Sequence, residues 1–220
     1  MDQKSGARRS GRPTEPKVTK DRIATEALAL IDERGWAALT MNSLAERLGV
    51  RAPSLYHHIS SQHDLIHLVR DLVVAKIDVS MFGQMPITPA LRAFGLSYHV
   101  AFAAHPNTIP VLSVSAIRDQ RTFTMYETVM VALSEANWSG ERSVEFLVAL
   151  EHIALGTAFE WSAEELMISA DEAERFGAPL LASYVSERTD QQDLAIRTFT
   201  NLLDMLISMF LAARDDETPQ

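Results

Sequence analysis

The segment Leu39–Leu65 most constrains what this chain can fold into. Leu44 and Leu48 recur at helical spacing, so they indicate the apolar face of a short helix. Gly49 follows them, where a left-handed residue ends a helix, and Pro53 stands where only the first turn of another helix tolerates it. The segment therefore predicts two helices joined by a tight turn, the arrangement that places a helix in the major groove of DNA.

The neighbouring segments carry helix signals of their own. Thr40 can cap the first helix through its hydroxyl, and Ser60 or Ser61 can cap a further helix that begins near Gln62. Gly35 ends an upstream helix whose apolar face repeats at helical spacing. That face consists of Ile23, Ala24, Ala27, Leu28, Leu30 and Ile31. A three-helix domain with a helix-turn-helix motif is the expected result.

This combination resembles the DNA-binding domain of the TetR (tetracycline repressor) family. The resemblance runs from about Arg22 to Leu72 and includes Gly49, Pro53 and the Leu-Tyr-His-His run at 55–58. It implies an all-α fold, in which an N-terminal three-helix domain precedes a larger helical domain for ligand binding and dimerisation. The expected divisions are a basic arm at 1–18, a helix-turn-helix domain at 19–66 and the larger domain at 67–215.

Charge is unevenly distributed along the chain. Residues 1–70 contain eleven Lys and Arg against eight Asp and Glu, a net charge of +3. Because the whole chain has a net charge of −9, residues 71–220 carry −12. A positive end can approach phosphate while the acidic body stays away from it. Within the polar arm, which is expected to be disordered, Arg8, Arg9 and Arg12 either contact DNA or are simply solvated.

Composition limits the class of protein further. With 220 residues, 47% of them hydrophobic and 22% charged, the chain suits a globular protein. It has no cysteine, which excludes disulfides and thiolate metal sites. No signal peptide or membrane-spanning run is recognisable, so the expected location is cytoplasmic, without membrane contact.

Apolar periodicity downstream predicts only helices. One helix over Gln62–Val79 would connect the DNA-reading part to the rest. Others are expected near Pro89–Ala104, His105–Ser113 and Arg121–Ala136, then from Ser139 or Gly140 to Phe159, and over Asp190–Leu211, the last with Asp190 and Asp193 as a capping box. Between 162 and 189 the pattern is irregular, with one short helix near Asp171–Arg175.

The Asp190–Leu211 helix is apolar on more than one face, which favours burial on two sides. With the Val144–Phe159 helix it would form a four-helix dimer interface, as the resemblance implies. A homodimer also suits DNA recognition, because two units roughly 34–36 Å apart read a near-palindromic double-stranded operator more tightly than one unit.

The resemblance assigns DNA contacts residue by residue. Base readout is expected from Asn42, Arg51, Ala52 and Ser54, and an Arg51–guanine pair is worth ~1–3 kcal/mol of discrimination. Thr40, Tyr56 and His58 match phosphate contacts, which set register without reading sequence. His57 suits either role. Gln62 stands where many relatives carry a lysine, so it would contact phosphate without adding charge.

The stretch from Met125 to Glu160 resembles the tetracycline-repressor type of C-terminal domain. On that alignment His105, Thr108 and the partner subunit's Glu160 fall near positions that hold a drug-bound magnesium, and Tyr98 near a stacking aromatic. Phe94 and Asp78 depart from the pattern, so an apolar or amphipathic effector is favoured over a metal chelate, and no resident metal or cofactor is expected. The residues expected to line the effector site are Tyr98, Phe102, His105, Met125, Phe146, Leu150 and Ile153. Without a cavity among them, these side chains are ordinary members of the hydrophobic core.

Three functions follow from these patterns. The favoured one is a transcriptional repressor that a small-molecule effector releases from its operator; whether the chain represses or activates depends on where the operator lies. A constitutive DNA-binding protein with a merely structural C-terminal domain is the first alternative. An enzyme is the second, with an acid–base site drawn from His99, His105, Glu151, His152 and Glu160, although no catalytic or cofactor motif is present.

Overall fold

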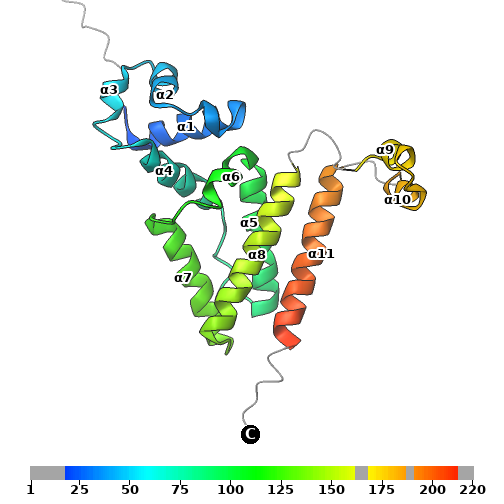
Figure 1. Ribbon diagram of the computed structural model, residues 1–220. Helices are drawn as coiled ribbons and strands as arrows, with labels where there is room; N and C mark the ends of the chain where they lie inside the picture. The colour runs from blue at the N-terminus through cyan, green and yellow to red at the C-terminus, as the bar shows by residue number, and fades with distance from the viewer. Residues whose placement is uncertain (1–17, 162–167, 187–190, 213–220) are drawn as a thin grey trace, which may run out of the picture.

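The computed structural model describes residues 18–161, 168–186 and 191–212, and within these ranges every regular element is a helix (Figure 1). Helices α1 (Lys20–Arg34), α2 (Met41–Leu48) and α3 (Ala52–Leu55) form a small domain at one end. The prediction of an all-α fold with an N-terminal helix-turn-helix domain and a larger helical domain is confirmed.

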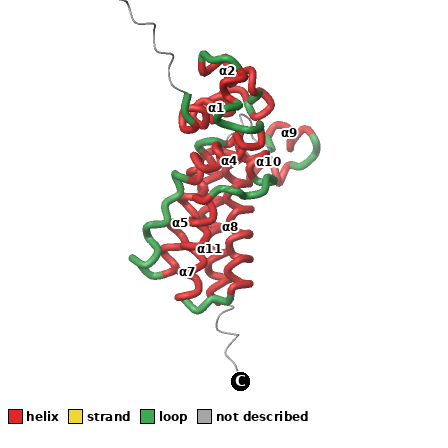
Figure 2. Tube along the Cα trace, turned by 90° about the vertical axis from the view of Figure 1, so that its left-hand side faces the viewer, coloured by secondary structure: helices red, strands yellow, loops and turns green. Residues whose placement is uncertain are grey.

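Helix α4 (Gln62–Val74) leads from the small domain into the larger one. The body consists of α5 (Ile87–Ala103), α6 (Ile109–Leu112), α7 (Gln120–Glu135), α8 (Gly140–Trp161) and α11 (Gln191–Ala212). Figure 2 shows α5, α8 and α11 running together below the small domain. Helices α9 (Ala170–Arg175) and α10 (Pro179–Val185) pack on each other and project from the body (Figure 1).

Local hydrogen bonds explain the geometry of the helix-turn-helix. Thr40 Oγ1 accepts from the Ser43 N–H at 3.1 Å, and Ser43 Oγ accepts from the Thr40 N–H at 2.9 Å, which makes a reciprocal capping box. Gly49 has φ 71° and ψ 31°, the left-handed conformation predicted for it. Ser61 and Asp64 form a second capping box at the start of α4, so Ser61 is the cap of the two serines considered.

One apolar core connects the two domains. It extends from Ile23 and Ile31 in α1, through Leu65 and Val69 in α4, to Leu203 in α11. Leu55 and Ile59, four residues apart, both point inward as expected. Because α4 contributes to the core of each domain, a change in its position is transmitted to both.

The predicted helix over Gln62–Val79 is wrong at its C-terminal end. Helix α4 stops at Val74, and the N–H groups of Lys76 and Ile77 donate to carbonyls three residues back, which tightens the chain into a turn. This turn buries Ile77 and Met81, and Ser97 Oγ accepts from the Asp78 N–H at 2.7 Å. Burial of these apolar side chains thus outweighs continuation of the helix.

Two other segments differ in detail from the expected helices. The His105–Ser113 helix is divided into a 3-10 turn at Pro106–Thr108 and the short α6. Helix α10 was not anticipated, and the expected cap at Asp190 lies outside the described residues. The remaining body helices occur where the periodicity predicts them, within a few residues.

The turn between α2 and α3 provides a stability test. Replacing Gly49 by Ala should lower the free energy of unfolding by about 1 kcal/mol, since a Cβ at positive φ strains the backbone. The added Cβ would meet no atom within 4 Å, so the cost comes from the backbone alone. Chemical denaturation followed by circular dichroism measures it. Gly140→Ala is the matched control, because Gly140 has the same open surroundings without positive φ; an equal loss in both variants would contradict the account.

Candidate DNA-binding and effector sites

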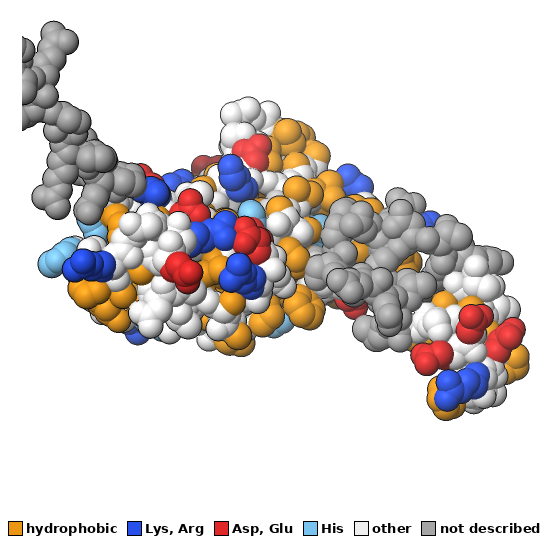
Figure 3. Space-filling model, turned by 90° about the horizontal axis from the view of Figure 1, so that it is seen from above, with side chains coloured by type: hydrophobic (Ala, Val, Ile, Leu, Met, Phe, Trp, Pro, Cys, Tyr) orange, Lys and Arg blue, Asp and Glu red, His pale blue; other side chains and the backbone are white. Residues whose placement is uncertain are grey.

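The outer face of α3 presents polar side chains to solvent. Arg51 and His57 are exposed, and Tyr56 has 54% of its surface accessible. Asn42 is exposed on α2, while Ala52, Ser54 and His58 are half-buried. Figure 3 looks onto this end of the molecule, where Lys and Arg side chains lie among acidic ones. The structure thus brings the predicted base- and phosphate-contacting residues to one end.

Arg47 fixes the recognition unit on α1. Its guanidinium pairs with Glu26 at 2.7 Å and forms a bidentate pair with Glu33, also at 2.7 Å. The Arg47 hydrogen bond lowers the pKa of the Glu33 carboxyl. Since α2 carries the turn into α3, these pairs set the orientation of the recognition helix relative to α1.

Two predicted phosphate ligands have structural hydrogen bonds in the absence of DNA. The Thr40 hydroxyl serves the capping box described above. Gln62 Nε2 donates to the Leu39 carbonyl at 2.7 Å, which fastens the start of α4 to the chain that enters α2. Gln62 therefore joins the connecting helix to the helix-turn-helix, a role that its position in the sequence did not suggest.

A small cavity of about 90 Å³ lies inside the larger domain. Five helices line it: α4 through Arg70 and Val74, α5 through Tyr98 and Phe102, α6 through Leu112, α7 through Met125 and Tyr126, and α8 through Glu151 and Leu155. The rings of Tyr98 and Phe102 stack with centroids 5.0 Å apart. Tyr98, Phe102 and Met125 are thus brought together as predicted for an effector site.

Glu151 is the acid of this cavity. Its Oε1 accepts hydrogen bonds from the hydroxyls of Tyr98, at 3.1 Å, and Tyr126. Burial raises the pKa of the Glu151 carboxyl above its usual range, although the two phenols and Arg70 act in the opposite direction. Burial also raises the pKa of both tyrosines, so they remain neutral donors.

Arg70 is the positively charged residue of the cavity lining and is almost completely buried, with 3% exposure. Its guanidinium donates to the carbonyls of Leu112 at 2.7 Å, Ser115 at 2.8 Å and Ala116 at 3.1 Å. These carbonyls lie at the end of α6 and just beyond it. Arg70 therefore joins the connecting helix α4 to the wall of the cavity.

The other predicted ligand-binding residues do not line this cavity. His105 Nδ1 is 2.9 Å from Asp32 Oδ2 of α1, and the Thr108 hydroxyl donates to the His105 carbonyl. Phe146 packs against Trp138 and Phe210. Leu150 is core, Ile153 is half-buried, and Glu160 is exposed on α8. Sequence reasoning missed Arg70 and Tyr126 as lining residues and placed Glu151 only in the enzyme alternative; a charged residue on an otherwise apolar helix face was the available signal.

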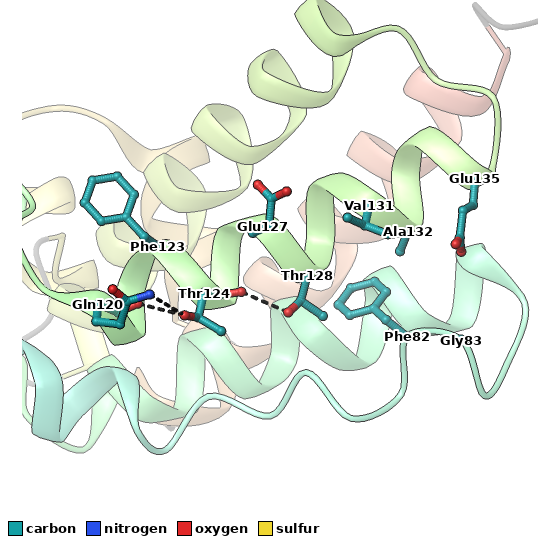
Figure 4. A pocket seen from close by; sticks show the side chains of 10 residues that line it. All are labelled: Phe82, Gly83, Gln120, Phe123, Thr124, Glu127, Thr128, Val131, Ala132 and Glu135. Carbon is teal, nitrogen blue, oxygen red and sulfur yellow. Dashed lines mark hydrogen bonds between the residues drawn. The ribbon is translucent and has the colours of Figure 1, made fainter.

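Two larger hollows lie along α7, and one of them adjoins the cavity. An open groove of about 700 Å³ lies between α7 and the Phe82-Gly83 connection, and Figure 4 shows Phe82 reaching toward that helix. A hollow of about 410 Å³ between α4 and α7 shares Gln120 and Thr124 with the groove. It also shares Val74 and Met125 with the inner cavity. The hollow between α4 and α7 therefore lies between the outer groove and the inner cavity and has lining residues in common with each.

The residues of the enzyme alternative are divided among different surroundings. His99 is buried and stacks on Phe199 with centroids 4.4 Å apart, and burial lowers its pKa to about 4. His105 faces Asp32 in the other domain, whereas His152 and Glu160 are exposed. Within the part of the chain that the structure describes, no cluster of three or more His, Asp or Glu side chains could hold a metal ion.

The geometry defines a helix-turn-helix protein, and comparisons with known proteins show which proteins it is similar to. Residues 23–69 match the family model for bacterial regulatory proteins of the tetR family. The chain is 27% identical over 160 residues to an HTH-type transcriptional regulator of Saccharopolyspora erythraea, a match covering 73% of this chain and 66% of that relative, just under two thirds of its length. It is also 25% identical to the class E tetracycline repressor of Escherichia coli over 66% of this chain and 69% of that one.

Solved structures show the same fold. Apo ActR of Streptomyces coelicolor superposes with a TM-score of 0.76 at 23% identity, covering 91% of this chain and 98% of ActR. ActR in complex with actinorhodin gives the same TM-score at 22% identity, covering 90% and 99%. Residues 23–69 are thus a DNA-binding domain of the tetR family, and the chain as a whole is similar to bacterial transcriptional regulators of that family.

Base readout by Arg51 is testable. Arg51→Ala should weaken operator binding by ~1–3 kcal/mol, or roughly five- to 150-fold, and relax the preference at one base position. Tyr56→Phe should instead weaken binding to all sequences to a similar degree, since a phosphate contact carries no sequence information. Fluorescence anisotropy on an operator found by genome-wide binding-site mapping measures both.

The matched control removes the same charge elsewhere. Arg175 lies on the projecting α9, away from the helix-turn-helix, so Arg175→Ala should bind the operator like the unaltered chain (Figure 1). If Arg51→Ala shows no change in affinity or base preference, the assignment of Arg51 is wrong.

Proposed function

We propose that this chain is a homodimeric repressor that binds a near-palindromic operator in the cytoplasm and is released from it by a small-molecule effector. The observation that carries the proposal is the dual position of α4. Arg70 and Val74 of this helix line the inner cavity, while Gln62 at its start is bonded to the helix-turn-helix domain. Filling the cavity therefore acts on the element that holds the DNA-reading unit.

Exposed apolar side chains on α8 and α11 support the dimer. They are Val144, Val148 and Phe159 of α8 and Met205 and Met209 of α11. The Leu194–Ala212 stretch is long and apolar enough to cross a membrane, yet only 28% of that window is buried within one subunit. A second copy of the chain, packing helix against helix, would cover this surface.

The relatives support a small-molecule effector. ActR is similar to this chain along nearly its whole length and has been solved in complex with actinorhodin. The inner cavity and the adjoining hollows offer this chain an apolar space with a few convergent polar groups, as small-molecule sites typically do. This favours a responsive regulator over the constitutive alternative.

Side-chain hydrogen bonds connect the domains in addition to the shared core; besides the His105–Asp32 contact there are two joints. Arg70 ties α4 to the end of α6, and Asn107 Nδ2 donates to the carbonyls of Ile31 at 3.2 Å and Asp32 at 3.1 Å at the end of α1. An effector that requires the α6 end to move would shift both joints and so misplace the recognition helices. By linkage, operator binding must then weaken effector binding by the same factor.

The direct test is operator release. Genome-wide mapping of binding sites gives the operator, and the neighbouring genes suggest compounds to screen by thermal shift. A compound that raises the thermal midpoint should weaken operator binding by about tenfold or more, a coupling of ~1.4 kcal/mol. If compounds bind in the cavity without changing operator affinity, the constitutive alternative holds.

The dimer surface gives a second prediction. Val148→Glu and Met205→Glu should each yield a monomer in analytical ultracentrifugation, because an unpaired charge in an apolar interface costs several kcal/mol. Operator affinity should fall accordingly. Val114→Glu is the control, since Val114 is 82% exposed but lies outside α8 and α11. Persistence of the dimer in both interface variants would contradict the proposed surface.

The hydrogen bonds of Arg70 to the end of α6 give a third prediction. Arg70→Met keeps an apolar stem in the cavity wall but removes the three hydrogen bonds to the α6 end. The variant should still bind effector, within about threefold, while the effector-induced loss of operator affinity shrinks by about tenfold. Isothermal titration and anisotropy on the same samples separate the two effects. Full operator release by Arg70→Met would show that coupling takes another route.

A further inference from the structure

The inner cavity contains a carboxylate whose hydrogen-bond partners are neutral. Glu151 accepts only from the phenols of Tyr98 and Tyr126 among the bonds resolved for it. No ion pair joins Glu151 to a cation within the described residues. A carboxylate removed from water without an opposite charge is stabilised when a cation reaches it.

Arg70 shares the cavity but does not fill that role. Its donors are directed at three carbonyls around the end of α6, so its charge is engaged with that peptide segment. The cavity thus contains one engaged cation and one carboxylate held only by phenols, and Glu151 is the group that gains most from a charged ligand.

The two hollows along α7 favour a cation as well. The outer groove is lined by the acidic side chains Glu127 and Glu135, with Phe82, Phe123 and Val131 as apolar surface and no Lys or Arg (Figure 4). Arg121 lines the adjoining hollow, but its guanidinium pairs with Asp71 at 3.0 Å. An acidic, apolar lining concentrates cations that carry an aromatic body.

We propose that the effector is an organic cation with a flat aromatic body, whose ammonium group binds Glu151 between Tyr98 and Tyr126. The body would lie against Met125 and extend into the hollow between α4 and α7. This inference deepens the proposed function and rests on it, since it names the chemical class of the effector at the same site.

Three anthracenes with a cationic, a neutral or an anionic substituent at the same ring carbon test the preference: 9-(aminomethyl)anthracene, 9-(hydroxymethyl)anthracene and anthracene-9-carboxylate. Their fluorescence reports binding to the full chain at neutral pH. The amine should bind at least about tenfold more tightly than the alcohol, and the carboxylate most weakly. In Glu151→Gln the advantage of the amine should disappear while the affinity for the alcohol changes by less than about twofold.

Glu141→Gln is the matched control, because Glu141 is an exposed acid at the start of the same helix α8. It should leave the preference for the amine unchanged. Thermal melts of both variants show whether each is folded, and binding of the alcohol provides the same check within the binding experiment itself.

Binding of the amine should also depend on pH. Because burial raises the pKa of the Glu151 carboxyl, affinity should rise with pH above the usual titration range of a carboxyl group, as Glu151 loses its proton while the amine keeps its own. The charged and titratable groups that face Glu151 are Tyr98 of α5, Tyr126 of α7, Arg70 of α4 and His152 of α8. The two tyrosines stay neutral, because burial raises their pKa. The rise should therefore persist in His152→Gln and vanish in Glu151→Gln.

The outcomes distinguish failure of the cationic-effector proposal from failure of the proposed function. Equal binding of the three anthracenes, preference for the carboxylate, or failure of the amine to bind overturns the cationic assignment. In those cases release of the operator by a neutral or anionic compound would leave the proposed function standing. If no compound of any charge changes operator affinity, the proposed function itself is contradicted.

Discussion

The hydrogen bonds of the Arg70 guanidinium determine how the parts of this molecule act together. A buried arginine without a carboxylate partner is costly unless its donors are satisfied, and here three carbonyls at and beyond the end of α6 satisfy them. The end of α6 and the middle of α4 must therefore stay in register. Because α4 also packs against α1, this constraint extends to the DNA-reading end.

The body of the protein is arranged around that constraint. Tyr98, Tyr126 and Glu151 come from three helices and meet beside Arg70, so a ligand that contacts them also contacts the element that positions α4. At its other end, α4 is bonded through Gln62 to the chain entering α2. A packed core has discrete arrangements rather than continuous ones, which is why a small change in the cavity can select between orientations of the recognition helix.

Local chemistry allowed much of the fold to be predicted from the sequence. The Thr40 cap, the left-handed Gly49 and the inward-facing Leu55 and Ile59 each depend on residues a few positions apart, and family resemblance extended them to the whole helix-turn-helix. The end of α4 was not predictable in this way, since it depends on burial of Ile77 and on a bond to Ser97, nineteen residues onward.

The cavity required still more distant information. Arg70 meets Leu112, 42 residues away, and Tyr98 meets Glu151, 53 residues away, so no periodicity within one helix indicates either pair. Alignment placed His105 and Thr108 in the effector site, yet here His105 bonds to Asp32 and Thr108 to the backbone of His105. The residue types were informative, but their partners were decided by tertiary packing.

The central claim is that a ligand in the cavity moves the two recognition units relative to each other. The chain lacks cysteine, so Glu46→Cys on exposed α2 places a single spin label in each subunit. Pulsed electron–electron double resonance would then measure the distance between the spin labels on the two DNA-binding domains of the dimer. The measurement is made with operator, without operator, and with a compound that raises the thermal midpoint. The account predicts that the compound shifts the distances away from those seen on the operator, where half-sites lie roughly 34–36 Å apart. Identical distance distributions with operator and with saturating compound would contradict it.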